Sequence, residues 1–349
     1  MTVAYLETDI NDYEVTRMAK AFGTEFMPEM AISWFNGSSW STPEMVPSDS
    51  LPLHPATHAL HYSSTCFEGL KAFRQEDGSV KIFRMDQNIA RFAQSSRLLA
   101  LPEIDEAATR QMILDVVAKF KDDVPPAPGS MYIRPTHFGT ELSIGKAAGA
   151  SDTSVQFVLL SPVGDYFAGG AAALRVLIDD QGMRCAPHMG MIKSGGNYAS
   201  ALNPIIKARA DYNADQILFA PDGNVQETGA ANFLLIDNNE IITKPLDESF
   251  LHGITRDSIL TLARDNGLTV SERELPVSEV LERSQNPTCE AALAGTAAVL
   301  APVGTFIYQD KEYSVGSGEL GPMTRRLKNQ LNAIQWGQAE DTHGWLTEV

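Results

Sequence analysis

The sequence predicts an α/β (α+β) fold of two domains, in which helices flank mixed β-sheets. Its length of 349 residues suits one large or two medium domains. Strand-like and helix-like segments alternate along the chain, and hairpin signals indicate antiparallel as well as parallel strand pairs. We expect a smaller N-terminal α/β domain over residues 1–160, an interdomain linker over 161–172 and a larger C-terminal domain over 173–349.

The first half of the chain reads as a hairpin, two helices and two strands. The text KAFRQEDGSVKIFRM, which begins at Lys71, alternates around an Asp-Gly turn and is typical of a hairpin. A helix follows, with Asp86 as its predicted cap and Pro102 as its stop. Asp105 opens a second helix, and the runs SMYIRPTHF and SVQFVLLS after it are strand-like.

The second half begins after the best linker candidate, SPVGDYFAGG at residues 161–170, which places one Pro and three Gly between strand-like runs. LRVLIDD then reads as a strand, and the Gly-rich turn KSGGN opens a helix through Lys207. The strand QILFAP, an Asp-Gly turn and the strand NVQETGAANFLLID follow. The text HGITRDSILTLARDNG predicts a helix with Thr255 at its N-terminus and Gly267 as its C-cap.

Composition and charge exclude several classes of function. Hydrophobic residues make up 44% of the chain and charged residues 20%, which is typical of a folded globular protein. Lysine and arginine number 27 against 44 acidic residues, so the net charge is −17. Such a chain has no long-range attraction for nucleic acid or for anionic membranes. The uncharged stretch 291–308 is rich in Ala and Gly and contains Pro302, which argues against a membrane span.

The cysteines and the N-terminal text indicate a cytoplasmic location. Cys66, Cys185 and Cys289 are far apart and form no C-x-x-C pair, which argues against a disulfide framework and a cysteine zinc site. The N-terminal text MTVAYLETDINDYE is acidic and lacks the pattern of a signal peptide. We therefore expect a reducing compartment.

Two other motifs in the sequence do not fit the function that they resemble. GTELSIGKA at residues 139–147 resembles a phosphate-binding loop, but it has one residue too many before Gly145-Lys146, and Ala147 replaces the hydroxyl that would hold magnesium. The histidines at 54, 58 and 61 could face one metal on a helix, but Pro55 argues against a helix there. No acidic or cysteine ligand lies alongside them, so we predict no metal site.

Residues with more specific chemistry gather in the second half. Lys193 comes just before a Gly-Gly-Asn-Tyr turn, so a ligand can approach it and Tyr198 can hydrogen-bond to it. Glu227 lies in a predicted strand among small residues. The segments GIT at 253–255 and GTA at 295–297 each offer Gly amides and a Thr hydroxyl, and the first opens a helix, which favours an anion. Taken singly, each feature is better explained by a solvated lysine, an exposed strand acid or a helix cap.

Together, these features are the parts that a pyridoxal phosphate site needs. The lysine forms an imine with the cofactor's aldehyde, and the acid keeps the pyridine nitrogen protonated so that the ring can accept electrons. The two Gly-Thr segments hold the phosphate. The combination therefore favours a pyridoxal phosphate enzyme over the separate explanations.

The chain resembles the branched-chain amino acid aminotransferases, which are pyridoxal phosphate enzymes of fold type IV. The resemblance runs in the family's order from about residue 54 to residue 304. The matching segments are HYSSTCFEGLKAFR, NIARFAQSSRLLALP, YIRPTHFGTE, SPVGDYF, IKSGGNYASALNP, ETGAANFLLI, SFLHGITRDSIL and AGTAAVLAPVG. The first 50 residues and the tail after Gly318 match less sharply, and no role is carried over from them.

The resemblance implies a cofactor role for seven residues. Lys193 would carry pyridoxal 5'-phosphate and act as the catalytic acid and base, and Tyr198 would hydrogen-bond to the cofactor's phenolic oxygen. Glu227 would pair with the ring nitrogen. The phosphate would be bound by four residues from three segments, namely Arg91, Ile254, Thr255 and Thr296.

The resemblance also implies a substrate pocket with apolar walls and one cation at its far edge. Tyr132 and the amides around Thr296 and Ala297 would receive the substrate's α-carboxylate. Arg134 would be available for the distal carboxylate of glutamate. Three aromatic residues would wall the side-chain pocket, namely Tyr62, Phe67 and Tyr166.

The implied reaction is a reversible, ping-pong transfer of the amino group between L-leucine, L-isoleucine or L-valine and 2-oxoglutarate. The resemblance further implies a homodimer, in which the first domain of one subunit completes the other subunit's pocket. Two alternatives on the same fold stay open: a D-amino-acid or amine transaminase, and a lyase such as aminodeoxychorismate lyase. Where some members carry a redox C-x-x-C, this chain has Ala298-Val299-Leu300-Ala301, so thiol regulation there is not expected.

Overall fold

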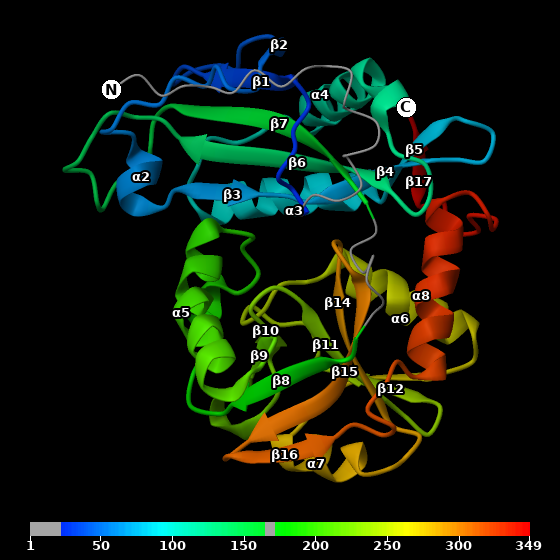
Figure 1. Ribbon diagram of the computed structural model, residues 1–349. Helices are drawn as coiled ribbons and strands as arrows, with labels where there is room; N and C mark the ends of the chain where they lie inside the picture. Colours follow the sequence, from blue (N-terminus) through cyan, green and yellow to red (C-terminus); the bar gives the residue numbers. More distant parts are fainter. Residues whose placement is uncertain (1–21, 165–171) are drawn as a thin grey trace.

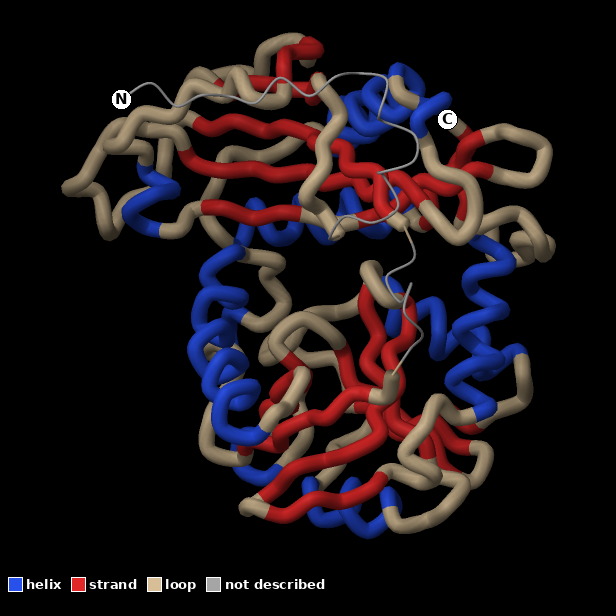
Figure 2. The backbone as a smooth tube through the Cα atoms, viewed as in Figure 1, coloured by secondary structure: helices blue, strands red, loops and turns tan. Residues whose placement is uncertain are grey.

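A computed structural model of the chain describes residues 22–164 and 172–349. These residues form two β-sheets, one above the other, with helices around them (Figures 1 and 2). The described strand pairs of the first sheet are antiparallel, whereas the second sheet contains both kinds. The predicted α+β class is therefore confirmed, and the mixed pairing lies in the second sheet.

The first sheet is built by the first half of the chain and one C-terminal strand. Its order is β17-β5-β4-β6-β7-β1-β2, and β3 pairs with β6. The strands are β1 (Glu29–Phe35), β2 (Glu44–Pro47), β3 (Thr65–Phe67), β4 (Leu70–Arg74), β5 (Val80–Phe83), β6 (Ser130–Gly139), β7 (Ser154–Val163) and β17 (Leu346–Glu348). The predicted hairpin is β4 and β5, and the two predicted long strands are β6 and β7.

Among the described residues, three α-helices accompany this sheet: α2 (His58–Tyr62), α3 (Met85–Leu98) and α4 (Glu106–Lys119). Asp105 caps α4 as predicted, because its carboxylate accepts from the amides of Ala107 and Ala108 at 2.9 and 3.0 Å. The prediction that Asp86 caps α3 is wrong. The cap position is Arg84, in a left-handed conformation with φ 50°, and Asp86 lies inside the first turn.

The short helix α2 forms in a segment where Pro55 argued against one. The helix begins only at His58, three residues after the proline, so Pro55 removes no hydrogen bond from it. His58 is buried, and its Nδ1 lies 2.8 Å from the Ser64 hydroxyl. Within residues 22–164 and 172–349, no group of three or more His, Cys, Asp or Glu side chains is placed to hold a metal ion.

The second sheet carries most of the second half of the chain. Its order is β10-β9-β8-β15-β14-β11-β12-β13, and β16 pairs with β15. The strands are β8 (Leu174–Asp179), β9 (Gln216–Phe219), β10 (Glu227–Thr228), β11 (Asn232–Asp237), β12 (Glu240–Thr243), β13 (Thr269–Glu272), β14 (Glu290–Gly295), β15 (Val299–Tyr308) and β16 (Lys311–Ser314). The single strand predicted over residues 224–237 is divided into β10 and β11. It breaks because the Thr228 hydroxyl accepts from the Ala231 amide and closes a turn.

In the part of the chain that the structure describes, four α-helices surround this sheet: α5 (Gly195–Tyr212), α6 (Ile254–Asp265), α7 (Val277–Ser284) and α8 (Pro322–Gln335). In Figure 2, α5 and α8 stand on opposite sides of the second sheet. The helix α5 extends five residues beyond the predicted end at Lys207 and stops at Asn213, which is left-handed with φ 51°. The helix α6 forms where it was predicted, but its caps differ. Its N-cap is Gly253, so Thr255 lies inside the first turn, and its C-cap is Asn266, which the predicted cap Gly267 follows with φ +77°.

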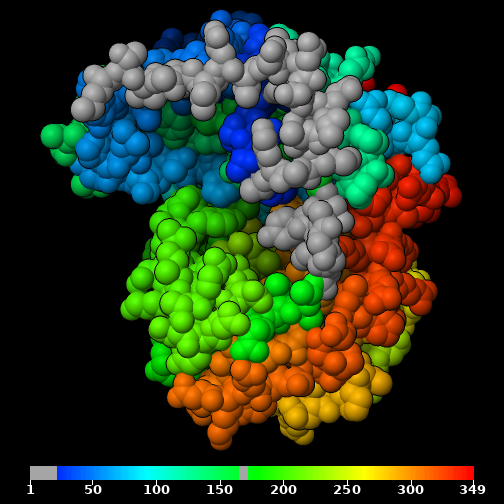
Figure 3. All heavy atoms as spheres, viewed as in Figure 1, coloured from blue at the N-terminus to red at the C-terminus, as the bar shows by residue number. Residues whose placement is uncertain are grey.

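Strand pairing bears on the predicted domain limits, which remain a prediction. The strand β7 runs to Val163, past residue 160, and residues 165–171 of the linker lie outside the described residues. The strand β17, near the C-terminus, pairs with β5 of the first sheet. The space-filling view shows the result, with the last residues against the segment around residue 80 (Figure 3). No helix in the described parts of the chain has the length and apolar character needed to cross a membrane.

Candidate active site

One cavity brings together residues from both halves of the chain. The helix α3 contributes from the first half, while the segment before α5, the turn after β10, the start of α6 and the end of β14 contribute from the second. All seven residues to which the resemblance gave a cofactor role line it, namely Arg91, Lys193, Tyr198, Glu227, Ile254, Thr255 and Thr296. Segments up to 205 residues apart in the sequence, from 91 to 296, therefore meet here.

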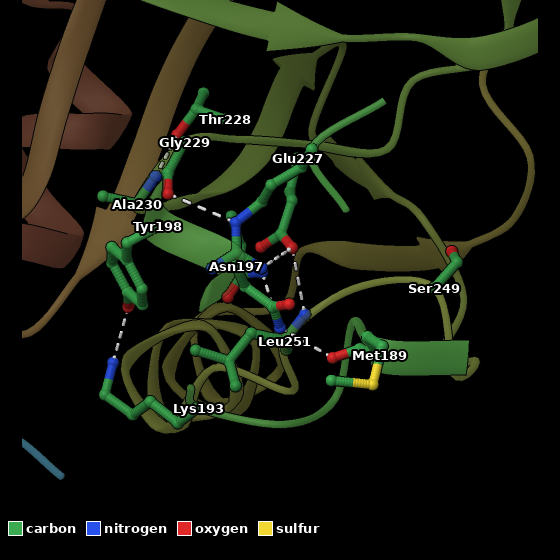
Figure 4. Close-up of polar contacts among 12 residues, drawn as sticks. Met189, Lys193, Asn197, Tyr198, Glu227, Thr228, Gly229, Ala230, Ser249 and Leu251 are labelled. Atoms are coloured by element: carbon green, nitrogen blue, oxygen red, sulfur yellow. Dashed lines mark hydrogen bonds and ion pairs between the residues drawn. The ribbon is translucent and has the colours of Figure 1, made fainter. Parts of the chain in front are cut away.

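Lys193 lies just before α5, and its ammonium group faces an aromatic pair. Its Nζ donates to the hydroxyl of Tyr198 at 2.8 Å (Figure 4) and lies 5.0 Å from the ring centre of Phe67. Ser194 caps the helix, and the buried Asn197 donates to the carbonyl of Met189 at 2.7 Å. These bonds fix the turn that presents the lysine to the cavity.

Glu227 is a buried acid, with 2% of its surface exposed. Its Oε1 accepts from the Nη1 of Arg184 at 2.7 Å and from the amide of Leu251 at 3.2 Å. Arg184 is equally buried, and its Nε donates to the carbonyl of Gly229 at 3.2 Å. The ordinary expectation for an acid in a strand, exposure to solvent, does not hold here.

The electrostatics of the site follow from burial and from these pairs. Burial raises the pKa of Glu227 to about 7, although Arg184 and the Leu251 amide act in the opposite direction. For Tyr198, burial acts to raise the pKa, but the cations of Lys193 and Arg184 outweigh it and the pKa is lowered. The cavity thus contains a carboxyl group whose pKa is close to neutral pH and a phenol whose pKa is lower than usual.

The other end of the cavity is suited to an anion. Arg91 donates through Nε and Nη2 to both carboxylate oxygens of Glu68, at 2.7 and 2.9 Å, and through Nη1 to the carbonyl of His252 at 2.9 Å. Although burial acts to lower the pKa of Arg91, the charge of Glu68 and the bond to it raise the pKa, so the guanidinium stays charged.

The start of α6 adds amide donors at the same end. Ile254 and Thr255 form its first turn, where backbone N–H groups have no partner within the helix. A Cβ at Gly253 would meet the Oδ1 of Asn232 at 1.9 Å, so glycine is required there. Asn232 in turn donates to the carbonyl of Leu251 at 2.8 Å and holds this loop against β11.

Three of the expected substrate residues form one cluster beside Lys193, although none of the three lines the cavity itself. The guanidinium of Arg134 lies 4.7 Å from the ring centre of Phe67, and its Nη2 donates to the hydroxyl of Tyr132 at 3.0 Å. Its buried Nε has no hydrogen-bond partner among the described residues. Gly69 makes room for this arrangement, because a Cβ there would meet the Tyr132 hydroxyl at 2.0 Å. Phe22, which the sequence did not indicate, packs edge-on against Tyr132 at 4.9 Å.

Thr296 and Ala297 form the turn between β14 and β15. Thr296 lines both the main cavity and an adjoining cavity, whereas Ala297 lines the adjoining one. The carbonyl of Ala297 accepts from the Nζ of Lys71 at 3.0 Å, which fixes the turn from the first half of the chain.

Two of the expected substrate residues are not in this arrangement. Tyr62 lies on α2, where its hydroxyl donates to the carbonyl of Ile144 at 2.6 Å, and it does not line the cavity that Lys193 lines. Tyr166 lies outside the described residues.

Sequence reasoning missed Arg184, Glu68 and Asn232. Arg184 and Glu68 hold Glu227 and Arg91, which the resemblance did identify, and Asn232 holds the loop before α6, so none stands out by its own chemistry. Glu68 follows an aromatic residue at the end of β3, a position where an acid is usually exposed, and it is fully buried here. The signal available for it was Arg91 itself, because a buried cation requires a partner.

Comparison with known proteins identifies the class. Residues 65–304 match the family described as amino-transferase class IV. The match covers more than half of the chain, so the chain belongs to the class IV aminotransferases.

Similarity to individual relatives places the chain in one group within this class. The chain is 37% identical to the branched-chain-amino-acid aminotransferase 2 of Bacillus subtilis over 337 residues, which cover 94% of this chain and 92% of that protein. It is 38% identical to a probable branched-chain-amino-acid aminotransferase of Streptomyces coelicolor over 333 residues, or 93% and 91% of the two chains. Within class IV, the chain belongs with the branched-chain-amino-acid aminotransferases.

A solved structure agrees with this placement. The T.th. branched-chain amino acid aminotransferase with pyridoxamine 5'-phosphate superposes with a TM-score of 0.73 at 26% identity, covering 91% of this chain and 97% of that one. The same T.th. enzyme has also been solved in complex with N-(5'-phosphopyridoxyl)-L-glutamate and with 4-methylvaleric acid.

Proposed function

We propose that this protein is a pyridoxal 5'-phosphate-dependent aminotransferase that moves the amino group between L-leucine, L-isoleucine or L-valine and 2-oxoglutarate. The observation that carries the proposal is the meeting of all seven expected cofactor residues in one cavity. The relatives support the same reaction, since the T.th. enzyme is complexed both with a phosphopyridoxyl-glutamate and with a branched aliphatic acid.

The residues of the cavity fit pyridoxal phosphate. A buried, charged Arg91, the first-turn amides of α6 and the hydroxyls of Thr255 and Thr296 are a donor set for a phosphate group. Glu227 offers the buried carboxylate that a pyridine nitrogen requires, and Lys193 the primary amine that an aldehyde requires. When bound, the cofactor supplies a carbonyl that takes up the amino group and a ring that withdraws electrons from the substrate's α-carbon.

The chain's own residues then divide the work. Lys193 would hold the aldehyde end of the cofactor, and its Nζ, once free, would act as general base and general acid for the α-proton. Tyr198, 2.8 Å from that Nζ, orients it. Glu227 holds the ring-nitrogen proton, and Arg184 favours the ionised carboxylate that this role needs. Arg91 and the amides at the start of α6 would hold the phosphate.

The substrate residues account for acceptance of two unlike side chains. Phe67 offers an apolar wall, and Arg134 beside it has a buried Nε available for a distal carboxylate. Tyr132 and the Thr296–Ala297 turn are the groups that we expect to receive the α-carboxylate. An aliphatic substrate uses the wall, and glutamate adds the charged contact at the edge.

We also propose that the protein is a homodimer in the cytoplasm. Tyr62 lies away from its own cavity, and Leu60, Leu142 and Ile144 near it are 57%, 60% and 71% exposed, as suits an interface through which Tyr62 completes a partner's pocket. All three cysteines are buried and free, which suits a reducing compartment.

The test of the reaction is the substitution Lys193→Ala. L-Leucine and 2-oxoglutarate are supplied with pyridoxal phosphate, and glutamate formation is measured. We expect turnover to fall about 100- to 10,000-fold, because the general acid and base is removed. Lys207→Ala, an exposed position on the following helix, should turn over like the unaltered protein. Rapid turnover by Lys193→Ala would disprove the mechanism, and activity with D-leucine alone would favour the D-amino-acid alternative.

A further inference from the structure

The backbone of Lys193 is held by the first half of the chain, although the residue belongs to the second half. Its amide N–H donates to the hydroxyl of Ser95 on α3 at 3.1 Å, and its carbonyl accepts from the amide of Phe67 in β3 at 3.0 Å. Ser194 continues this contact through an isolated β-bridge with Cys66. Hydrogen bonds at both its N–H and its C=O therefore fix the backbone of Lys193.

The helix α3 places Ser95 for this contact. Ser95 follows Arg91 by four residues, so the two side chains share one face of the helix. The side chain of Ser95 is fully buried, and so is that of Ser96, but the two serines face different groups. The Ser96 hydroxyl donates to the carbonyl of Phe92 at 3.0 Å and lies 3.0 Å from the Nδ1 of His137.

We propose that Ser95 is a positioning residue for Lys193, an inference that rests on the proposed role of that lysine. The helix α3 then positions groups at both ends of the cavity. Arg91 faces the anion-binding end, and Ser95 fixes the backbone of Lys193. The side chain of Lys193 must move between the cofactor and the α-proton while its Cα stays still. The hydrogen bond from the amide N–H of Lys193 itself to Ser95 holds that Cα without restraining the lysine side chain.

Loss of this bond should affect the chemical step more than binding. A displacement of the reacting group by about 1 Å can cost up to about 100-fold in rate, while the groups that bind the substrate are untouched. For a single neutral hydrogen bond we expect kcat to fall about tenfold and KM to change less than about twofold.

The experiment compares variants that differ in one hydroxyl. Ser95→Ala and Ser96→Ala are prepared as holoenzymes, together with Ser95→Thr and Ser95→Val, which have nearly the same shape but only Thr keeps the acceptor. Amide hydrogen exchange at Lys193 is measured by mass spectrometry with residue-level fragmentation, and kcat and KM are measured with L-leucine. Exchange reports the bond directly and does not depend on the enzymatic reaction.

We expect faster exchange at the Lys193 amide and a lower kcat in Ser95→Ala and Ser95→Val, with both restored towards normal in Ser95→Thr. Ser96→Ala should leave both unchanged. The proposal is overturned if Ser95→Ala behaves as the unaltered enzyme, if Ser95→Ala and Ser96→Ala lose activity alike, or if Thr and Val are equivalent at position 95. An unaltered protein that shows no transamination would instead contradict the proposed function, and the exchange data would still decide the Ser95 contact.

Discussion

Glu227 shows how much one buried side chain depends on its surroundings. Its carboxyl group is removed from water, which favours the neutral acid, and Arg184 at 2.7 Å opposes that effect. A ring-nitrogen partner must be ionised, so the arginine is as important to the proposed chemistry as the acid itself. Because the pKa of Glu227 is near 7, the balance between burial and the charge of Arg184 can be measured in the cofactor-free protein.

We predict that Glu227 makes the cofactor-free protein less stable as the pH rises. The pKa in the folded state is about 7, above the usual 4.5, so its stabilising contribution is complete below about pH 4.5 and is lost as the pH rises through about 7. Relative to Glu227→Gln, which does not titrate, the unfolding free energy should fall by up to about 3 kcal/mol over that range. Urea unfolding of both proteins at pH 5 and pH 8 measures this difference. A constant difference would show that Glu227 stays ionised throughout.

The elements differ in how closely they follow local signals. The helix α4 begins where Asp105 caps it, because a side-chain oxygen close in sequence satisfies its first amides. The helix α3 lacks such a cap, and its start is fixed by tertiary contacts instead. Arg84 takes up a left-handed conformation there and donates through Nη1 to the Ser258 hydroxyl on α6 at 3.0 Å. Local capping therefore predicts one helix start and misplaces the other.

We predict that Asp105→Ala destabilises the protein by about 1 kcal/mol without lowering kcat. The substitution leaves the amides of Ala107 and Ala108 without their acceptor. Asp115→Ala, at an exposed position of the same helix, should cost less than about 0.5 kcal/mol. Thermal unfolding and steady-state kinetics of the three proteins test this. Equal destabilisation by the two substitutions would rule out the cap as the cause.

At the scale of the whole molecule, the site depends on contact between the two halves. Arg91 reaches the His252 carbonyl, Lys71 reaches the Ala297 carbonyl, and Ser95 reaches the Lys193 amide. The C-terminal strand β17 returns to β5, next to the start of α3 (Figure 1). The polar groups of the cavity are therefore positioned by bonds that cross between the halves.

We predict that Ile144→Lys disrupts a homodimer. Ile144 is 71% exposed beside Tyr62, and a charge there could not be buried at an interface without a large cost. Analytical ultracentrifugation should show a shift from dimer to monomer, with a fall in kcat/KM as the partner's Tyr62 is withdrawn. Leu98→Lys, at another exposed apolar position, should leave the dimer intact. A protein that is monomeric before substitution would disprove the homodimer.

The sequence by itself determined the class of the protein, because the chemistry of a lysine, an acid and two Gly-Thr segments lies in short motifs that hold their order along the chain. It also determined α4 and the β4–β5 hairpin, whose cap and turn are local, and the place of α6 along the chain. Only the tertiary structure decided that Glu227 is buried against Arg184, that Glu68 is the partner of Arg91, and that Ser95 touches Lys193. These facts depend on which distant segments pack together, and burial and ion pairing between such segments leave no periodic trace in the sequence.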